Sequence, residues 1–223
     1  MNVIAINASP RKTKNTGTLL AKALEGAASK GAQTELVHLY DLQFKGCVSC
    51  FACKVKNCKT PGICLYKDEL SPILEKCMQA DAIILGSPVY FWDVTGEMRS
   101  FLERLMFPVL TYTEGYKGLL ERNIPVGFIY TMNVTREFLQ ESEYIRLLEP
   151  AQTGLERFFG YCEALYSYNT VQFDDYSKYV CTVFDEGEKL QVRKEQFPID
   201  CEDAFELGIR LAGLAKSATT ALI

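Results

Sequence analysis

Short runs of apolar and β-branched residues alternate along the chain with stretches in which apolar residues recur every three or four positions. Such runs, bounded by turn residues, predict buried strands. The predicted strands cover residues 3–6, 35–39, 81–86, 125–130 and 163–171. The stretches with helical periodicity predict amphipathic helices. These helices cover residues 18–30, 68–80, 98–106 and 136–159, and a last helix buries Phe205, Leu207, Leu211, Leu214 and Ala218.

This alternation of strand and helix predicts a parallel sheet with helices on both faces. Right-handed crossovers leave few topologies, and five strands suit the order 2-1-3-4-5 of a flavodoxin-like three-layer sandwich. We therefore expect an α/β fold in a single domain over residues 1–223. Two segments lie outside the simple pattern, a cysteine-rich loop at 44–67 and an insertion at 172–198 before the last helix.

Charge and hydropathy exclude several classes of protein. The 24 Lys and Arg residues against 28 Asp and Glu residues give a net charge of −4, without a block of like charges. This balance argues against nucleic acid or an anionic membrane as a partner. No stretch approaches the roughly 18 apolar residues of a membrane span. Because the N-terminus runs directly into Ser9-Pro10-Arg11-Lys12, it does not resemble a signal peptide, and we expect a cytoplasmic protein.

In sheets of this kind, ligands bind at the carboxyl ends of the strands where the strand order reverses. The loop at 7–17, after the first strand, gathers hydroxyls and positive charges at the start of a helix. Unpaired N–H groups and the helix dipole make such a place an anion site. An ordinary turn with a capped helix is the alternative. The side chains that could donate to a phosphate are those of Ser9, Arg11, Asn15, Thr16 and Thr18.

The loop after the third strand, at residues 86–96, contains three adjacent aromatic residues, Tyr90, Phe91 and Trp92. Aromatic side chains at a strand end can line a flat apolar ligand, although they could also cover the core or a subunit contact. Together, a phosphate site and a planar-ring site at the two switch-point loops describe a mononucleotide such as FMN.

The motifs Ser9-Pro10-Arg11, Asn15-Thr16 and 86–91 resemble those of the NADPH-dependent FMN reductase family. With the cysteines between them, the chain also resembles the iron-sulfur flavoprotein branch of that family. The resemblance implies FMN phosphate contacts from Ser9, Arg11, Asn15, Thr16 and Thr18, and a flavin ring along Pro88, Val89, Tyr90 and Phe91. It implies a third contact from Thr131, Met132 and Asn133. The chain departs from commoner members at Trp92-Asp93 and in its insertion, which concern the substrate pocket more than the cofactor.

Five of the nine cysteines fall in one loop, and they are Cys47, Cys50, Cys53, Cys58 and Cys64. In a reducing compartment, clustered thiols bind metal or do redox chemistry more often than they form disulfides. The C-x2-C-x2-C spacing with a fourth cysteine suits a [4Fe–4S] cluster, which we expect to approach the flavin or a facing subunit. Cys58 fits the spacing, whereas Cys64 stands where relatives place their last cysteine. A four-thiolate zinc site and plain reduced thiols remain open.

The other candidate residues have a structural interpretation. His38 is the single histidine, so no Ser-His-Asp arrangement is present and no catalytic residue is assigned. A flavin carries the hydride chemistry itself. Asp174-Asp175 and the charged run at 185–194 are interpreted as solvated faces. Buried structural thiols are expected for Cys77, Cys162, Cys181 and Cys201.

The resulting expectation is an FMN-dependent oxidoreductase that takes hydride from NADH or NADPH and passes electrons to a small acceptor. The alternatives are a flavodoxin-type electron-transfer protein reduced by a protein partner, and a zinc-stabilised interaction domain, which leaves both loops unexplained. A homodimer or higher homo-oligomer is also expected, because aromatic residues crowd around the fifth strand and the insertion. They are Phe158, Phe159, Tyr161, Tyr166, Tyr168, Tyr176, Tyr179 and Phe184.

Overall fold

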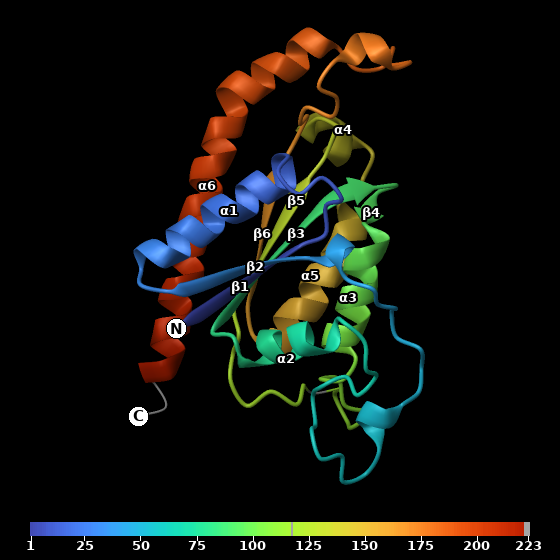
Figure 1. The fold of residues 1–223 in the computed structure, drawn as a ribbon, viewed down its shortest axis with the longest axis vertical. Coiled ribbons are helices and arrows are strands. Elements are labelled where there is room, and N and C mark those ends of the chain that lie inside the picture. Colours follow the sequence, from blue (N-terminus) through green and yellow to red (C-terminus); the bar gives the residue numbers. More distant parts are fainter. Residues whose placement is uncertain (117, 221–223) are drawn as a thin grey trace.

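A six-stranded sheet forms the centre of the computed structural model, which describes residues 1–116 and 118–220 (Figure 1). Its long parallel strands are β1 (Asn2–Asn7), β2 (Gln33–His38), β3 (Ala82–Tyr90), β5 (Val126–Thr131) and β6 (Cys162–Ser167). They lie in the order β2-β1-β3-β5-β6. Counted along the chain, this is the predicted 2-1-3-4-5 order, and the flavodoxin-like α/β class is confirmed.

Helices cover both faces of the sheet, as Figure 1 shows. One face carries α1 (Asn15–Ser29) and α6 (Glu186–Thr220), and the other carries α2 (Ser71–Gln79), α3 (Gly96–Met106) and α5 (Ile145–Phe159). The short helix α4 (Arg136–Glu141) lies at the carboxyl end of the strands. Single 3-10 turns occur at Leu39–Asp41, Ala52–Lys54 and Tyr176–Lys178.

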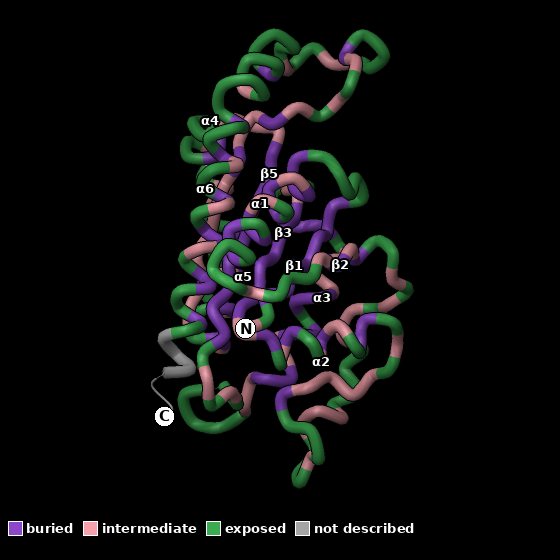
Figure 2. Tube along the Cα trace, turned by 60° about the vertical axis from the view of Figure 1, so that its left-hand side comes forward, coloured by how far each residue is buried: buried purple, intermediate pink, exposed green. Residues whose placement is uncertain are grey.

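The core is divided between the two faces of the sheet because successive strand residues point to opposite sides. In β1, Val3 and Ala5 pack with α1 and α6, whereas Ile4 and Ile6 pack with α2 and α3. The central strands are therefore buried on both sides, as the tube in Figure 2 shows. This double burial explains why they are nearly continuous apolar runs rather than alternating ones.

A sixth strand, β4 (Asp93–Val94), lies outside the predicted pattern. It pairs antiparallel with the end of β3, because β3 continues past Gly86 to Tyr90 instead of ending there. Phe91 and Trp92 make the turn between the two strands in the left-handed region, with φ of 49° and 66°. The aromatic loop is thus a tight hairpin at the carboxyl end of the sheet.

The last helix corrects the predicted insertion at 172–198. α6 begins at Glu186, so the irregular segment ends at residue 185 and Pro198 lies inside the helix. The sequence interpretation ended the insertion at Pro198 because proline lacks the N–H that an interior helix position uses. Leu207 and Leu211 are buried as expected, but Leu214 is exposed. Phe205 is half-buried, and the side chain of Ala218 lies outside the described residues.

The predicted helix at 136–159 is wrong as a single element. α4 and α5 are separated at Ser142–Tyr144, where Glu143 adopts a positive φ of 58°. Most of the aromatic residues around β6 and the irregular segment are buried or half-buried within this chain, and Tyr179 is the exposed member. Among the described residues, no helix is long and apolar enough to cross a membrane.

The cysteine-rich loop at 44–67 runs down beside α3, at the lower right in Figure 1. Its backbone is fixed to the C-terminal end of that helix. The N–H of Cys47 donates to Oε2 of Glu103 at 3.0 Å. The ammonium of Lys54 donates to the carbonyls of Phe107 and Leu110 and lies over the Phe107 ring. The end of α3 is therefore the platform on which the cysteines are placed.

Candidate functional site

A pocket lies where the loops after β1, β3 and β5 meet, at the upper end of the sheet in Figure 1. It brings together all the predicted cofactor-binding residues except Thr18, Tyr90 and Phe91. The lining also includes Lys14, Thr170 and Gln172, which the sequence interpretation missed. The lining residues are Ser9, Arg11, Lys14, Asn15, Thr16, Pro88, Val89, Thr131, Met132, Asn133, Thr170 and Gln172.

The first loop has the features of an anion site. α1 begins at Asn15, and the side chain of its N-cap residue, Lys14, makes no capping hydrogen bond with the described residues. The first turn contains no acidic residue, so the positive end of the helix dipole is not neutralised there. The loop is held by its own hydrogen bonds, since Ser9 Oγ accepts from the N–H of Arg11 at 3.2 Å and Thr16 Oγ1 lies 2.7 Å from Thr131 Oγ1.

Thr18 lies outside the pocket. Its hydroxyl donates to the carbonyl of Lys14 at 3.1 Å, within its own helix, as threonine hydroxyls in helices commonly do. Tyr90 and Phe91 also lie outside it, because the β3–β4 turn directs them to the surface and leaves Phe91 91% exposed. Trp92 packs on Tyr144 with ring centroids 4.7 Å apart.

The irregular segment after β6 covers the first loop. The guanidinium of Arg11 donates to the carbonyl of Gln172, and Asn15 Nδ2 donates to the carbonyl of Val171 at 2.9 Å. The ammonium of Lys14 pairs with Asp174, whose pKa the hydrogen bond from Lys14 lowers. Asp174 is solvent-exposed as expected, so this pair contributes little to stability. The segment supplies one wall of the pocket rather than only a solvated face.

The charged run at 185–194 is not entirely a solvated face, because Lys189 is buried. Its ammonium donates to both the carbonyl and the side-chain oxygen of Asn133, and burial lowers its pKa to about 8. Arg193 donates to Asn15 Oδ1 at 3.4 Å. Lys189, Arg193 and Phe197 recur every four residues, and that spacing is the sequence signal that could have placed these cations on one face of α6.

A second pocket lies between the cysteine-rich loop and the end of α3. Four of the five predicted metal ligands line it, namely Cys47, Cys50, Cys53 and Cys64, and Cys58 does not. All are free thiols. Burial raises the pKa of Cys53, with Lys54 acting in the opposite direction. Within the described residues, no three Cys, His, Asp or Glu side chains converge closely enough for one metal ion.

The remaining thiols and the histidine have structural surroundings. Cys77 is fully buried, as expected, and burial raises its pKa. Cys162, Cys181 and Cys201 are half-buried, so the expectation that they are buried is wrong for these three. His38 lies at the end of β2 with its Nδ1 3.1 Å from Asn7 Nδ2, and burial lowers its pKa.

Comparison with known proteins agrees with this geometry. The family model of NADPH-dependent FMN reductase matches residues 1–137. An iron-sulfur flavoprotein of Methanocaldococcus jannaschii is 39% identical over 104 residues, which is 47% of this chain and 51% of that protein. One from Archaeoglobus fulgidus is also 39% identical over 104 residues, 47% of this chain and 48% of that protein. The chain spans about half the length of these curated relatives.

Solved structures share the fold over nearly the whole chain. An NAD(P)H:quinone oxidoreductase from Methanothermobacter marburgensis aligns with a TM-score of 0.66 and 16% identity, covering 95% of this chain and 96% of that one. An azoreductase from Bacillus anthracis aligns with a TM-score of 0.64 and 13% identity, covering 94% and 99%.

Proposed function

Because the chain belongs to the NADPH-dependent FMN reductase family, we propose that it is an FMN-dependent NAD(P)H oxidoreductase that passes hydride or electrons to a small acceptor. The observation that carries the proposal is the pocket in which three strand-end loops meet. When bound, FMN would supply the hydride and electron chemistry. A cytoplasmic location, where thiols stay reduced, fits this proposal.

The residues of the pocket fit FMN. The open end of α1, with Arg11 and Lys14 beside it, provides positive charge for a phosphate. Ser9, Asn15 and Thr16 are buried polar side chains that line the pocket, and hydrogen bonds within the protein hold them there. Pro88 and Val89 provide an apolar surface next to these donors. A polar end and an apolar end in one pocket are what a mononucleotide requires.

The test is a flavin titration followed by reduction. Purified protein should show flavin absorbance or acquire it when FMN is added, and anaerobic NADH or NADPH should bleach it. A folded protein that neither carries nor binds FMN would overturn the proposal. Bleaching by a protein donor but by neither nicotinamide would favour the flavodoxin-type electron carrier instead.

We also propose that Cys47, Cys50, Cys53 and Cys64 hold a [4Fe–4S] cluster. Support comes from their common pocket, which excludes Cys58, and from the similarity to proteins named iron-sulfur flavoproteins. Four thiolates are also the ligand set of a structural zinc ion, so the metal content distinguishes the two.

The matched variants Cys64→Ser and Cys58→Ser test which cysteine is the fourth ligand. Anaerobically prepared protein should contain about four irons and four acid-labile sulfides per chain. Cys64→Ser should lose them and Cys58→Ser should keep them. The reverse pattern would make Cys58 the ligand, one zinc per chain would support a structural metal, and no metal would leave ordinary thiols.

The C-terminal turn of α3 lines the cysteine pocket, whereas the N-cap of that helix, Thr95, donates to the carbonyl of Ala8 in the loop after β1. The helix has 11 residues and is about 16 Å long at 1.5 Å per residue, which favours a cluster that faces a second subunit over one that approaches the flavin of its own chain. A cluster on the outer surface is better placed to face a second copy of the chain. We therefore propose a homodimer or higher homo-oligomer, with contacts near the cysteine-rich loop.

A further inference from the structure

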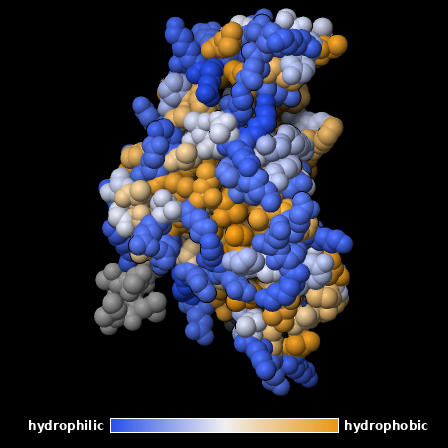
Figure 3. All heavy atoms as spheres, in the orientation of Figure 1, coloured by the Kyte–Doolittle hydropathy of each residue, from blue (hydrophilic) through white to orange (hydrophobic). Residues whose placement is uncertain are grey.

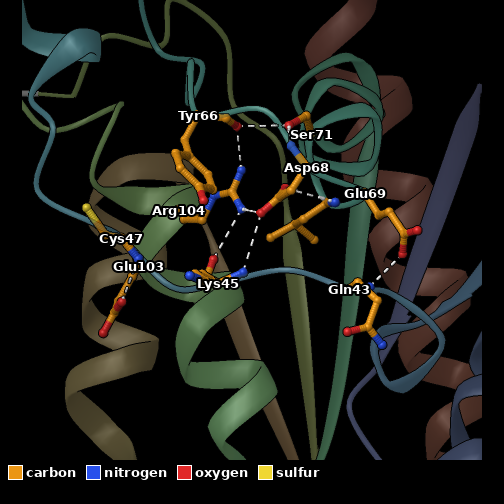
Figure 4. Close-up of polar contacts among 10 residues, drawn as sticks. Gln43, Lys45, Cys47, Tyr66, Asp68, Glu69, Ser71, Glu103 and Arg104 are labelled. Atoms are coloured by element: carbon orange, nitrogen blue, oxygen red, sulfur yellow. Dashed lines mark hydrogen bonds and ion pairs between the residues drawn. The ribbon is translucent and has the colours of Figure 1, made fainter.

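The cysteine pocket contains one buried cation. Arg104, on the last turn of α3, is 1% exposed, and it is the one Lys or Arg among the described residues that line the pocket. Figure 4 shows its guanidinium held between the cysteine-rich loop and the start of α2. Nη1 donates to the carbonyl of Lys45 at 3.1 Å and pairs with the Asp68 carboxylate, and Nη2 donates to the carbonyl of Tyr66 at 2.8 Å.

The Nε–H of Arg104 is different, because this buried atom has no hydrogen-bond partner among the described residues. Buried donors are nearly always paired, and an unpaired one costs free energy. The rest of the side chain cannot turn to relieve it, since the Nη atoms are fixed and the Tyr66 ring lies 5.2 Å from the guanidinium carbon. An acceptor that forms only when the pocket is loaded would explain the arrangement.

Cys64 lines the same pocket as Arg104 and stands two residues before Tyr66, whose carbonyl Arg104 already binds. Its sulfur is therefore the candidate for such an acceptor. A thiolate is a stronger acceptor than a thiol, because hydrogen bonds to charged partners are the stronger ones. A cysteine becomes a thiolate when it binds metal.

We propose that Arg104 is a positioning residue for the cluster, whose Nε–H donates to the Cys64 thiolate and fixes Cys64 as the fourth ligand. This inference rests on the cluster proposed above. The buried positive charge and the hydrogen bond to sulfur stabilise the more negative, reduced state of the site, because both are determinants of cluster potential. Arg104 thus raises the reduction potential and slows the loss of iron.

The experiment compares Arg104→Met and Arg104→Lys with the wild type after anaerobic reconstitution with iron and sulfide. Arg122→Met is the matched control, because Arg122 donates to the carbonyls of Met78 and Ala80 and does not line the pocket. The measurements are iron and sulfide per chain, the midpoint potential of the cluster, and the rate at which a chelator removes its absorbance. FMN binding reports folding.

We expect Arg104→Met to have a lower midpoint potential and to lose iron at least tenfold faster, whereas Arg122→Met behaves like the wild type. Arg104→Lys keeps a charge for Asp68 but lacks Nε, so it should be intermediate, and it decides the question if Arg104→Met does not fold. If folded Arg104→Lys and Arg104→Met have the midpoint potential and the rate of iron loss of the wild type, the role of Arg104 is overturned but the cluster proposal stands. If the wild type itself contains no iron and sulfide, both the role of Arg104 and the cluster proposal are overturned. FMN binding tests the oxidoreductase proposal separately in either case.

Discussion

Arg11 is the residue whose removal should most directly weaken cofactor binding. Its guanidinium lies at the pocket and donates to the carbonyl of Gln172. A hydrogen bond from a charged group contributes roughly 1.5–3 kcal/mol, so Arg11→Ala should weaken FMN binding about 10- to 100-fold. Titration of flavin fluorescence measures the dissociation constant. The control is Lys22→Ala, which removes a cation from the exposed side of α1, where it pairs with Glu25. An Arg11→Ala protein with wild-type affinity would remove Arg11 from the phosphate site.

Lys189 makes the stability of the fold depend on pH. Burial lowers its pKa to about 8 in the native protein, although Cys181 and Glu188 favour the charged form. A lysine in an unfolded chain has a pKa of about 10.4. At pH values between these two pKa values, the unfolded chain binds a proton at Lys189 that the native chain does not. The contribution of Lys189 to the free energy of unfolding therefore rises with pH in this range.

Comparison of the wild type with Lys189→Met isolates this effect, because the other titrating groups cancel in the difference. Urea unfolding of the flavin-free proteins at pH 7, 8, 9 and 10 should show a constant difference up to about pH 8. Above that, the difference should move steadily in favour of the wild type. A difference that stays constant to pH 10 would show that Lys189 keeps an ordinary pKa in the folded protein.

At the scale of single residues, the sequence predicted what lies inside short motifs and missed what tertiary contact brings in. Ser9, Asn15 and Thr16 lie close together in the chain, between the end of β1 and the first turn of α1, so their chemistry was visible in the sequence. Lys189 meets Asn133 across 56 positions, and Gln172 meets Asn133 across 39. No local pattern in the segment before α6 indicates which loop it will cover.

The packing of α1 against α6 depends on two glycines. A Cβ on Gly208 would lie 1.8 Å from the carbonyl oxygen of Ala23, and one on Gly26 would lie 1.9 Å from that of Phe205. Alanine is the better helix former by about 1 kcal/mol, so helix propensity alone predicts that Gly208→Ala stabilises. We expect the opposite sign, because the obstructing atoms are backbone and the two helices would have to separate.

Gly213→Ala is the control on the same helix, since a Cβ there meets no heavy atom within 4 Å. Thermal unfolding should show a lower midpoint for Gly208→Ala. For Gly213→Ala the midpoint should be unchanged, or raised by the equivalent of about 1 kcal/mol of helix propensity. Equal midpoints for the two variants would mean that the helices are not in backbone contact at Gly208.

At the scale of elements, strands were easier to predict than the helices after residue 131. A central strand buried on both faces leaves a continuous apolar run, as in Ala82–Leu85. α6 begins with charged residues that lie beyond the sheet, as the tube in Figure 2 shows, so its first turns have no apolar stripe to reveal them. Pro198 then misplaced its start, because a proline one turn or more inside a helix looks the same in sequence as a proline that stops one.

At the scale of the whole molecule, the order of the strands followed from alternation and right-handed crossovers alone. The position of the cysteine-rich loop did not. Its attachment depends on Lys54 and Cys47 meeting the end of α3, about 50 residues further along the chain, rather than on a periodic pattern. The sequence therefore predicted the helix at 98–106 but not the end of it against which the cysteine-rich loop lies.

The position of this loop motivates a prediction about assembly. Apolar side chains are exposed at the lower end of the face drawn in Figure 3, where the cysteine-rich loop lies. Phe51 and Tyr112 both make edge contacts with the Phe107 ring, with centroids 6.1 and 6.4 Å away, and Val55, four residues after Phe51, is 58% exposed. Contiguous exposed apolar patches mark interaction sites, and aromatic residues are enriched in interface cores.

The wild type should therefore sediment at about 50 kDa or more, at least twice the 25.1 kDa of one chain, at micromolar concentration. Tyr112→Asp should shift it towards the monomer without loss of FMN, because a buried unpaired carboxylate is costly in an apolar interface. Phe91→Asp is the control, since Phe91 is 91% exposed on the β3–β4 turn, at the carboxyl end of the sheet and away from the cysteine-rich loop. A monomeric wild type would contradict the assembly. An oligomer broken by Phe91→Asp but not by Tyr112→Asp would place the contact at the flavin end, and the cluster would then face solvent.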